Sequence, residues 1–326
     1  FRNVTEVQTC ALPIFCDSIY FRGKKKIVKI HIDNVNMGSN SGPNSFAKRI
    51  AMGLIESGHE VEIYDGRNSD ISLVFIEPSG RPLAKKVVQR LDGIWFSPSE
   101  FHTKNIHIKN LYEKADGVIW QSEFDKQMAT KWWGFPKKGN VILNGINVKP
   151  VDQFKISSLE QIRQKYEMLF VCSANWHPQK RLDSNVEMFK HLKNFYKSSA
   201  LIVMGANAKM VPDTDIFYTG SQPHEVCLEV FSAANWMIHL AWLDHCPNTV
   251  VESLSQGTPV ICSEQGGTKE LVGNFGLVLK ESNPYNYELV DYNFPPKIDV
   301  MQVKEDRKST RLNSSHVSES RMPSSA

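Results

Sequence analysis

Apolar residues along this chain follow two periods, and segments with the two periods alternate. Short runs rich in β-branched and aromatic residues, such as KIVKIHID at 26–33 and MLFVCSAN at 168–175, predict buried strands. Between such runs, apolar residues recur three and four positions apart, as in FAKRIAMGLIESG at 46–58, which predicts an amphipathic helix. Alternating strands and helices are typical of a parallel sheet that is covered by helices on both faces.

This alternation runs through the chain twice. The first series ends in the turn-rich segment NGINVKPVDQF at 144–154, and the second series begins directly after it. We therefore predict an α/β fold of two doubly wound, Rossmann-like domains that face a cleft, at 24–147 and 148–305. Further helices are expected at 103–115, 123–134, 159–166, 182–196, 223–233, 248–255 and from Thr268 onward.

Both ends of the chain resemble sequence that is not native. Back-translated, the tail DRKSTRLNSSHVSESRMPSSA at 306–326 resembles a sequencing-library adapter, and VQTCALPI at 7–14 resembles the reverse strand of that adapter. We therefore expect 1–14 and 306–326 to be adapter-derived, the tail to be disordered, and the second domain to be truncated. The alternative is a natural disordered tail.

Composition and charge exclude several classes of function. The formal net charge of +3 becomes +1 without the two ends, because 1–14 is neutral and 306–326 carries four basic and two acidic residues. Such a balance predicts no general nucleic-acid-binding surface. No apolar run approaches the roughly 18 residues that span a bilayer, and no signal-peptide pattern is visible. The six cysteines form no C-x-x-C motif, which is typical of reduced thiols in a cytoplasmic protein.

Several familiar motifs are missing from the sequence. No G-x-G-x-x-G follows the first strand, and no Walker motif is present, so dehydrogenase and P-loop NTPase functions lose their main support. The histidines lack H-x-x-x-H spacing, and the D-x-D pair of Asp213 and Asp215 is interpreted as a turn, so we predict no metal site. His239 lies within an expected strand and is interpreted as a packed core histidine.

Candidate chemistry gathers in WMIHLAWLDHCPNTVVESLSQGTPVICSEQGG, residues 236–267. A strand leads into a loop, Pro247 lies in the first turn of the following helix, and Asn248 or Thr249 can help to cap that helix. The free backbone N–H groups at a helix start bind anions, so this start suits a diphosphate.

Two acidic residues flank this helix start. Asp244 lies near the carboxyl end of the strand, where doubly wound sheets bind ligands. Glu252 lies one to two turns into the helix, and its carboxylate can accept two hydrogen bonds from a vicinal diol such as ribose. The alternative is that Asp244 only complements the helix terminus and that Glu252 lies on a solvated face.

The stretch 236–271 resembles the signature of the retaining GT-B glycosyltransferases that use nucleotide-sugars, family 4, also called glycosyl transferases group 1. That signature has an acid, seven residues, a Glu, the pattern A-x-x-x-G-x-P-V and a later G-G-x-x-E. Asp244, Glu252, Gly266 and Gly267 occupy the corresponding positions. The resemblance implies that Asp244 contacts donor-sugar hydroxyls and that Glu252 binds ribose. The family usually has Glu where this chain has Asp244.

A second match is SANWHPQKRLD at 173–183, where the family has G-R-x-x-x-x-K and places the Arg and the Lys on the donor diphosphate. Aligned on Pro178, Lys180 keeps the lysine, Asn175 replaces the arginine, and Arg181 is the candidate for the missing charge. A cation at this place would stabilise the negative charge that develops on the leaving diphosphate. The alternative for Lys180 is an ordinary surface lysine.

A third match is the Gly-rich loop that contains Gly42, which precedes a G-H-x-V segment at 58–61 as in the family. Glycine there would permit a close approach of the backbone to another group. Arg90 and Asp92 lie where the family often has a histidine on the acceptor side, which makes them acceptor-side candidates.

The resemblance implies a metal-independent, hexosyltransferase-type glycosyltransferase without a cofactor besides its nucleoside-diphosphate-sugar donor. It would transfer the sugar, with retention, to a glycan, a lipid-linked acceptor or another hydroxyl, with Asp244, Lys180 and Glu252 as catalytic residues. Its location would be cytoplasmic, with peripheral contact to the inner membrane face as an option. The alternatives are a nucleotide-sugar epimerase of GT-B fold and an inactive glycosyltransferase-like binding protein, which the departures at Asp244 and Asn175 would suit.

Overall fold

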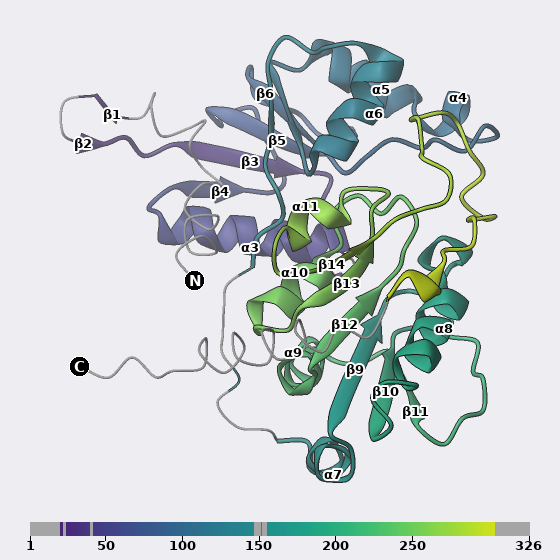
Figure 1. Cartoon of the computed structure of the whole chain (residues 1–326). Helices are drawn as coiled ribbons and strands as arrows, with labels where there is room; N and C mark the ends of the chain where they lie inside the picture. The colour runs from purple at the N-terminus through teal and green to yellow at the C-terminus, as the bar shows by residue number, and fades with distance from the viewer. Residues whose placement is uncertain (1–19, 22–23, 40–41, 147–150, 152–154, 304–326) are drawn as a thin grey trace. The chain divides into compact units, whose positions relative to one another are not determined.

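The computed structural model describes residues 20–21, 24–39, 42–146, 151 and 155–303. The predicted adapter-derived ends therefore lie outside the described residues, as does most of the predicted domain boundary. The chain divides into two compact units (Figure 1). The N-terminal unit contains the described residues up to 146 and the segment Tyr285–Asp291, and the C-terminal unit contains Val148–Pro284 and the described residues from Tyr292 onward.

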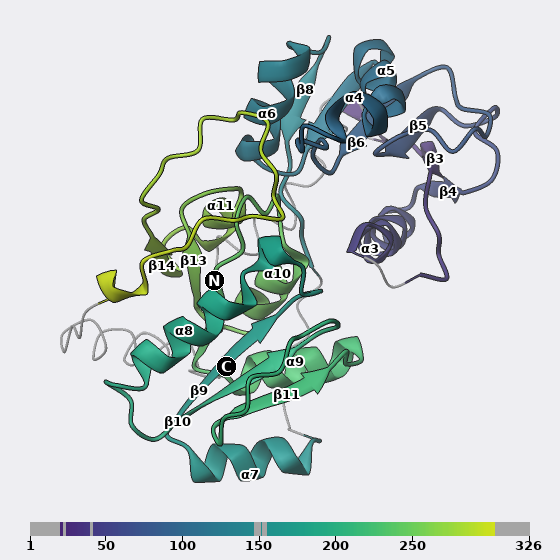
Figure 2. The same ribbon diagram turned by 90° about the vertical axis from the view of Figure 1, so that its right-hand side faces the viewer.

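The N-terminal unit is built on a parallel six-stranded sheet with the order β4-β3-β5-β6-β7-β8. Helix α3 lies on one side of this sheet, and α5 and α6 lie on the other (Figures 1 and 2). The strands are β3 (Lys29–Asp33), β4 (Glu60–Glu62), β5 (Ile71–Phe75), β6 (Val87–Leu91), β7 (Gly117–Trp120) and β8 (Gly139–Val141), and the helices are α3 (Gly42–Glu56), α4 (Phe101–Lys104), α5 (Ile106–Lys114) and α6 (Glu123–Trp133). A short antiparallel pair, β1 (Tyr20–Phe21) and β2 (Lys24–Lys25), precedes them.

Two predicted helices of this unit differ from the structure. The first begins at Gly42, four residues before the predicted start at 46, because proline is tolerated in the first turn of a helix and Pro43 does not end it. The predicted helix 103–115 consists of α4 and α5, which are divided at Asn105. The side chain of Asn105 bonds to the backbone of Trp95 and thereby competes with a continuous helix.

The C-terminal unit is built on a second parallel six-stranded sheet, with the order β11-β10-β9-β12-β13-β14. Its strands are β9 (Met168–Ser173), β10 (Ser199–Met204), β11 (Ile216–Gly220), β12 (Trp236–His239), β13 (Val260–Ser263) and β14 (Gly276–Leu279). Its helices are α7 (Ser157–Lys165), α8 (Leu182–Leu192), α9 (His224–Ala233), α10 (Asn248–Ser255) and α11 (Thr268–Val272), with short 3₁₀ helices η1 (Pro178–Lys180) and η2 (Val300–Gln302).

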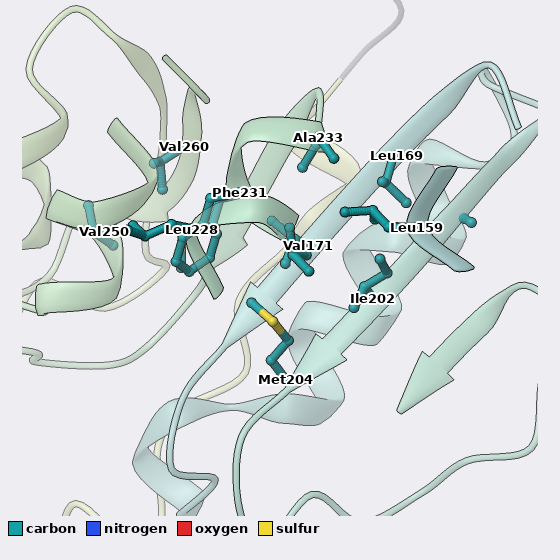
Figure 3. Close-up of a cluster of buried hydrophobic side chains, with 14 of the residues drawn as sticks. Leu159, Leu169, Val171, Ile202, Met204, Leu228, Phe231, Ala233, Val250 and Val260 are labelled. Atoms are coloured by element: carbon teal, nitrogen blue, oxygen red, sulfur yellow. The ribbon is translucent and has the colours of Figure 1, made fainter. Parts of the chain in front are cut away.

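The core of the C-terminal unit lies on both faces of its sheet. Successive strand residues point to opposite faces, so Leu169 and Val171 of β9 belong to one apolar cluster and Phe170 and Cys172 belong to the other. Figure 3 shows the first cluster, in which Val171 lies among side chains from the helices α7 and α9. Burial on both faces explains why β9 is a continuous apolar run rather than an alternating one.

Both sheets reverse their strand order at one point. In the C-terminal sheet, β10 and β11 continue to one side of β9, whereas β12, β13 and β14 continue to the other. In the N-terminal sheet the reversal lies between β3 and β5. The prediction of two doubly wound α/β domains is therefore confirmed, while the predicted cleft stays a prediction. Ligands of such sheets bind at the carboxyl ends of the strands on either side of the reversal.

The segment Tyr285–Asp291 packs with the N-terminal unit, although it lies inside the range 148–305 that the sequence assigned to the second domain. The indole Nε1 of Trp132 donates to the carbonyl of Tyr287 at 2.9 Å, and the amide of Val290 donates to the carbonyl of Phe96 at 3.0 Å. In the sequence Tyr285, Tyr287 and Leu289 alternate with polar residues, but this pattern does not indicate against which unit the segment packs.

No helix in the described part of the chain is long and apolar enough to cross a membrane.

Candidate active site

The strand reversal of the C-terminal sheet brings two predicted site residues together. Lys180 ends η1, in the connection that follows β9, and Asp244 lies in the loop that follows β12. Because β9 and β12 are parallel neighbours, these two connections leave the same edge of the sheet. The ammonium Nζ of Lys180 lies 2.6 Å from the carboxylate Oδ2 of Asp244. An ion pair therefore occupies the point where ligands of doubly wound sheets bind.

Asp244 is buried and fully engaged. Its Oδ2 also lies 3.0 Å from His239 Nε2, and its Oδ1 accepts a hydrogen bond from the amide of His245 at 3.0 Å. Burial alone would raise the pKa of Asp244, but the charge of Lys180 and the bond from His239 outweigh it and hold this pKa well below its usual value. Asp244 is therefore an ionised carboxylate whose charge Lys180 balances.

Gly266 and Gly267 fasten the loop after β13 to Asp244. The amide of Gly267 donates to the carbonyl of Asp244 at 2.7 Å, and Gly266 forms an isolated parallel bridge with the same residue. A Cβ on Gly266 would lie 2.7 Å from the Asp244 carbonyl oxygen, and the φ of Gly266 is +101°. Both observations require glycine at 266, because the close approach leaves no space and the backbone angle disfavours a side chain.

Arg181 has a different role from the predicted one. Its guanidinium is buried and paired with Glu281, with Nη1 at 2.6 Å from Oε1 and Nη2 at 3.2 Å from Oε2. Glu281 also accepts a hydrogen bond from Ser263 at 2.6 Å. Because this buried ion pair already neutralises the guanidinium, the geometry does not support Arg181 as the replacement for the missing diphosphate-binding arginine.

Asn175 lies on the exposed connection after β9, five residues before Lys180. Its side-chain oxygen accepts a hydrogen bond from Asn207 at 2.8 Å. Its predicted role in donor binding stays a prediction, and it brings no charge to the site.

The start of α10 differs in one respect from the prediction. Pro247 is the N-cap residue itself, and its side chain makes no capping hydrogen bond. The amides of Val250 and Val251 both bond to the Pro247 carbonyl, at 3.1 and 3.3 Å. The partial positive charge of a helix start favours an anion, and the Pro247 side chain does not compete for it.

Glu252 lies on α10 with 8% of its surface exposed. Its Oε1 lies 3.4 Å from Nε2 of His224, the first residue of α9, which follows β11. Helix α10 packs against α9, so Glu252 faces the start of a second helix at the carboxyl edge of the sheet. The contact with His224 was not predicted from the sequence.

The acceptor-side candidates lie in the N-terminal unit. Arg90 ends up buried, forms an ion pair with Asp92, and donates to Asn144 Oδ1 at 2.5 Å. Its guanidinium carbon lies 4.1 Å from the centroid of the Phe46 ring. These partners give Arg90 a structural role, so the geometry does not support it as a direct acceptor ligand. Gly42, the remaining predicted residue of this unit, is the exposed first residue of α3.

The sequence reasoning missed His239 and Glu281. His239 was interpreted as a core histidine, and it is buried, but its ring also contacts Asp244. It is the last residue of β12 and lies five residues before Asp244. This position at the carboxyl end of a strand could have indicated that His239 lies near the site. Glu281 follows β14, a strand that the sequence analysis did not predict.

Among the residues that the structure describes, no group of three or more His, Cys, Asp or Glu side chains could hold a metal ion. Asp213 and Asp215 form a turn, in which the carboxylate of Asp213 accepts the amide of Asp215 at 3.0 Å. The carboxylate of Asp215 itself is engaged by Tyr166 and Lys193.

Two doubly wound α/β sheets in one chain are the architecture of the GT-B fold. Residues 155–288 match the sequence model of the family described as Glycosyl transferases group 1, and this segment contains the ion pair, α10 and the glycine loop. The resemblance found in the sequence is therefore confirmed. Among curated proteins, the chain has no match.

Solved structures of glycosyltransferases share the fold of this chain. Three of them each cover 78% of this chain and 86% of their own. WaaG, a glycosyltransferase involved in lipopolysaccharide biosynthesis, has a TM-score of 0.59 and 15% identity. HepE from Anabaena, in complex with UDP-glucose, has a TM-score of 0.57 and 17% identity. Sucrose-phosphate synthase from Thermosynechococcus elongatus has a TM-score of 0.62 and 13% identity.

Proposed function

We propose that this chain transfers a sugar from a nucleoside-diphosphate-sugar donor to a hydroxyl acceptor. The observation that carries the proposal is the ion pair of Lys180 and Asp244 at the strand reversal of the C-terminal sheet, beside the start of α10. A lysine ammonium and the amides of a helix start are complementary to a diphosphate. The family match of residues 155–288 supports the same assignment.

Lys180 is suited to bind the diphosphate without leaving Asp244. Its side chain keeps 22% of its surface exposed, and an ammonium has three N–H donors, of which Asp244 engages one. The other donors are available to phosphate oxygens. As the bond between the anomeric carbon and the phosphate oxygen breaks, negative charge grows on the leaving diphosphate, and a fixed cation stabilises that charge.

The proposed reaction proceeds with retention and without an obligatory metal. The acceptor oxygen forms its bond to the anomeric carbon on the face from which the diphosphate leaves, and the acceptor proton passes to the leaving phosphate oxygen. This step needs no covalent nucleophile from the protein. The contribution of the chain is then positioning and charge stabilisation.

Glu252 would bind the ribose of the donor. Its carboxylate is held near the start of α9 by His224, and a carboxylate can accept hydrogen bonds from both hydroxyls of a vicinal diol. Asp244 would contribute mainly through Lys180, because both of its oxygens already accept hydrogen bonds inside the protein.

The donor and acceptor classes to test first come from the structural relatives. HepE was solved with UDP-glucose, which makes UDP-hexoses the first donors, and WaaG is involved in lipopolysaccharide biosynthesis, which makes glycan and lipid-linked acceptors the first acceptors. A cytoplasmic protein, with or without peripheral membrane contact, would fit these substrates.

The test is a panel of UDP-, GDP- and ADP-sugars, each assayed for protection against melting and for turnover with and without glycan acceptors, in the presence of EDTA. We expect one nucleotide class to raise the melting temperature and to support acceptor-dependent transfer. Lys180→Ala should abolish most of both effects, whereas Lys190→Ala, which changes an exposed lysine of α8, should preserve them. Full turnover by Lys180→Ala would remove the proposed role.

The same panel separates the two alternatives. A nucleotide-sugar epimerase would convert the donor without an acceptor. A binding protein that has lost activity would be protected against melting by a nucleotide-sugar and would show no turnover, an outcome that the uncharged Asn175 and the fully engaged Asp244 would explain.

A further inference from the structure

His239 is a buried residue that contacts Asp244, and the proposed mechanism gives it no role. It is the last residue of β12, with 4% of its surface exposed, and its Nε2 lies 3.0 Å from Oδ2 of Asp244. Because Asp244 is ionised, this oxygen can only accept, and Nε2 of His239 must carry the proton that is donated to it.

The same Oδ2 also accepts from Lys180, so His239 and Lys180 share one carboxylate oxygen. The two donors differ in freedom. The imidazole of His239 is buried at the carboxyl end of β12. The ammonium of Lys180, in contrast, ends a long and partly exposed side chain. When the ammonium also binds a phosphate, the imidazole still holds the carboxylate.

The backbone around Asp244 is fixed independently of these side chains. The amide of Trp242 donates to the carbonyl of Gln179 at 2.9 Å, and the Gly267 amide donates to the carbonyl of Asp244. Leu243, which lies between Trp242 and Asp244, has a φ of +53°. This conformation turns the chain back, so that Asp244 contacts His239 of the preceding strand. This arrangement leaves the direction of the carboxylate to be set by hydrogen bonds, and His239 supplies the most rigid of them.

We propose that His239 is a positioning residue that fixes the carboxylate of Asp244, so that Asp244 in turn aims the ammonium of Lys180 at the donor diphosphate. The inference rests on the proposed function, because it assigns His239 a part in the same site. It differs from a packing role in one respect: it requires a hydrogen-bond donor at the place of Nε2, and not merely a side chain that fills the space.

Two substitutions separate these roles. The amide nitrogen of glutamine reaches about as far from the backbone as Nε2 of histidine, whereas that of asparagine reaches only as far as Nδ1. His239→Gln should therefore retain most of the kcat, and His239→Asn should lower kcat by roughly 10- to 100-fold, the range found when residues that orient a ligating side chain are removed. His191→Asn is the matched control, because His191 is also buried in this unit and bonds to the carbonyl of Val303, away from the site.

The experiment measures kcat and the donor KM of the full chain with the donor found in the panel, and the melting temperature of each variant. We expect His239→Asn to lower kcat more than it raises KM, and to add no further loss in the Lys180→Ala background, since the two residues act through one carboxylate. Wild-type kcat in folded His239→Asn, or an equal loss in His239→Gln and His239→Asn, would overturn the inference.

Failure of the inference and failure of the proposed function give different results. If Lys180→Ala transfers sugar as well as the wild type does, the proposed function is wrong and the role of His239 with it. If only the two His239 variants behave like the wild type, the proposed function stands without this residue. If His239→Asn does not fold, His239→Gln decides alone, because a folded glutamine variant with a kcat loss above tenfold contradicts the proposal.

Discussion

The two sheets of this chain hold a buried or half-buried cation at their carboxyl edges, and the two cations are treated differently. In the N-terminal unit, the side chain of Arg90 is 4% exposed, stacks on Phe46 and is enclosed by Asp92 and Asn144. In the C-terminal unit, the side chain of Lys180 is 22% exposed and has Asp244 as its ionic partner.

The difference in exposure indicates which of the two cations can bind a ligand. Both cations are paired with an aspartate, but the planar guanidinium is buried and stacked on the Phe46 ring, whereas the ammonium is partly exposed to solvent. A buried ion pair contributes to the structure, and the ammonium of a partly exposed one can exchange water for phosphate. Substitutions at the two positions should therefore separate stability from activity.

Removal of the buried cation should give the largest effect, and the effect should be on stability. Arg90→Ala removes the ionic partner of Asp92 and one donor to the side-chain oxygen of Asn144, which is expected to lower the free energy of unfolding by about 3–5 kcal/mol. Urea denaturation followed by circular dichroism measures the change. Arg67→Ala, which breaks an exposed ion pair with Asp65, is the control and should leave stability nearly unchanged.

Removal of the partly exposed cation should instead reduce catalysis. Lys180→Ala is expected to lower kcat by about 10²–10³-fold, the range for loss of one group that stabilises developing negative charge. Its effect on stability should be smaller than that of Arg90→Ala, because Asp244 keeps its bonds from His239 and His245. Steady-state kinetics and urea denaturation of both variants measure the two effects. An equal loss of stability in Lys180→Ala and Arg90→Ala would contradict the proposed difference between the two cations.

Glu252 extends the comparison to an acid at the same edge. Glu252→Ala should raise the donor KM by roughly 10- to 150-fold, which corresponds to loss of hydrogen bonds to a charged group of about 1.5–3 kcal/mol. Glu187→Ala on the exposed face of α8 is the control and should leave KM unchanged. An unchanged KM for Glu252→Ala would place the ribose elsewhere.

Much of the fold, and part of the contrast between Arg90 and Lys180, could be predicted from the sequence. Strands such as β9 were visible because burial on both faces makes them continuous apolar runs, and α10 was visible from its apolar spacing and its proline. β14 was not predicted, although its sequence GLVL is apolar and as long as β12 and β13.

The partners of charged residues could not be predicted in the same way. Arg181 and Glu281 are 100 positions apart, and nothing in either local sequence reveals that they form a buried pair. Lys180 and Asp244 were both predicted as site residues from the family pattern, but their mutual contact depends on β9 and β12 being neighbours, which is a property of the topology. His239 shows the same limit, since a buried histidine and a positioning histidine share one sequence pattern.

The glycine loop allows a finer test of the C-terminal site. Gly266→Ala places a Cβ 2.7 Å from the Asp244 carbonyl oxygen at a positive φ, whereas Gly257→Ala has a φ of +77° but open space around the new Cβ. Both variants should lose about 1–2 kcal/mol of stability from the backbone angle. Only Gly266→Ala should also lower kcat, because it displaces Asp244. Equal kcat in the two variants would show that the loop contact does not matter for catalysis.

The smallest expected effect concerns the position at which the family has an arginine. Asn175→Arg would add a cation at an exposed position on the same connection as Lys180, without the enclosure that neutralises Arg181. An exposed charge pair contributes about 0.2–1 kcal/mol, so the donor Kd should fall by roughly 1.5- to 5-fold. The gain should disappear at high salt, because exposed charges are screened. Isothermal titration at two salt concentrations measures it, with Asn175→Gln as the neutral control, and an equal affinity of the two variants at low salt would mean that the diphosphate lies beyond the reach of residue 175.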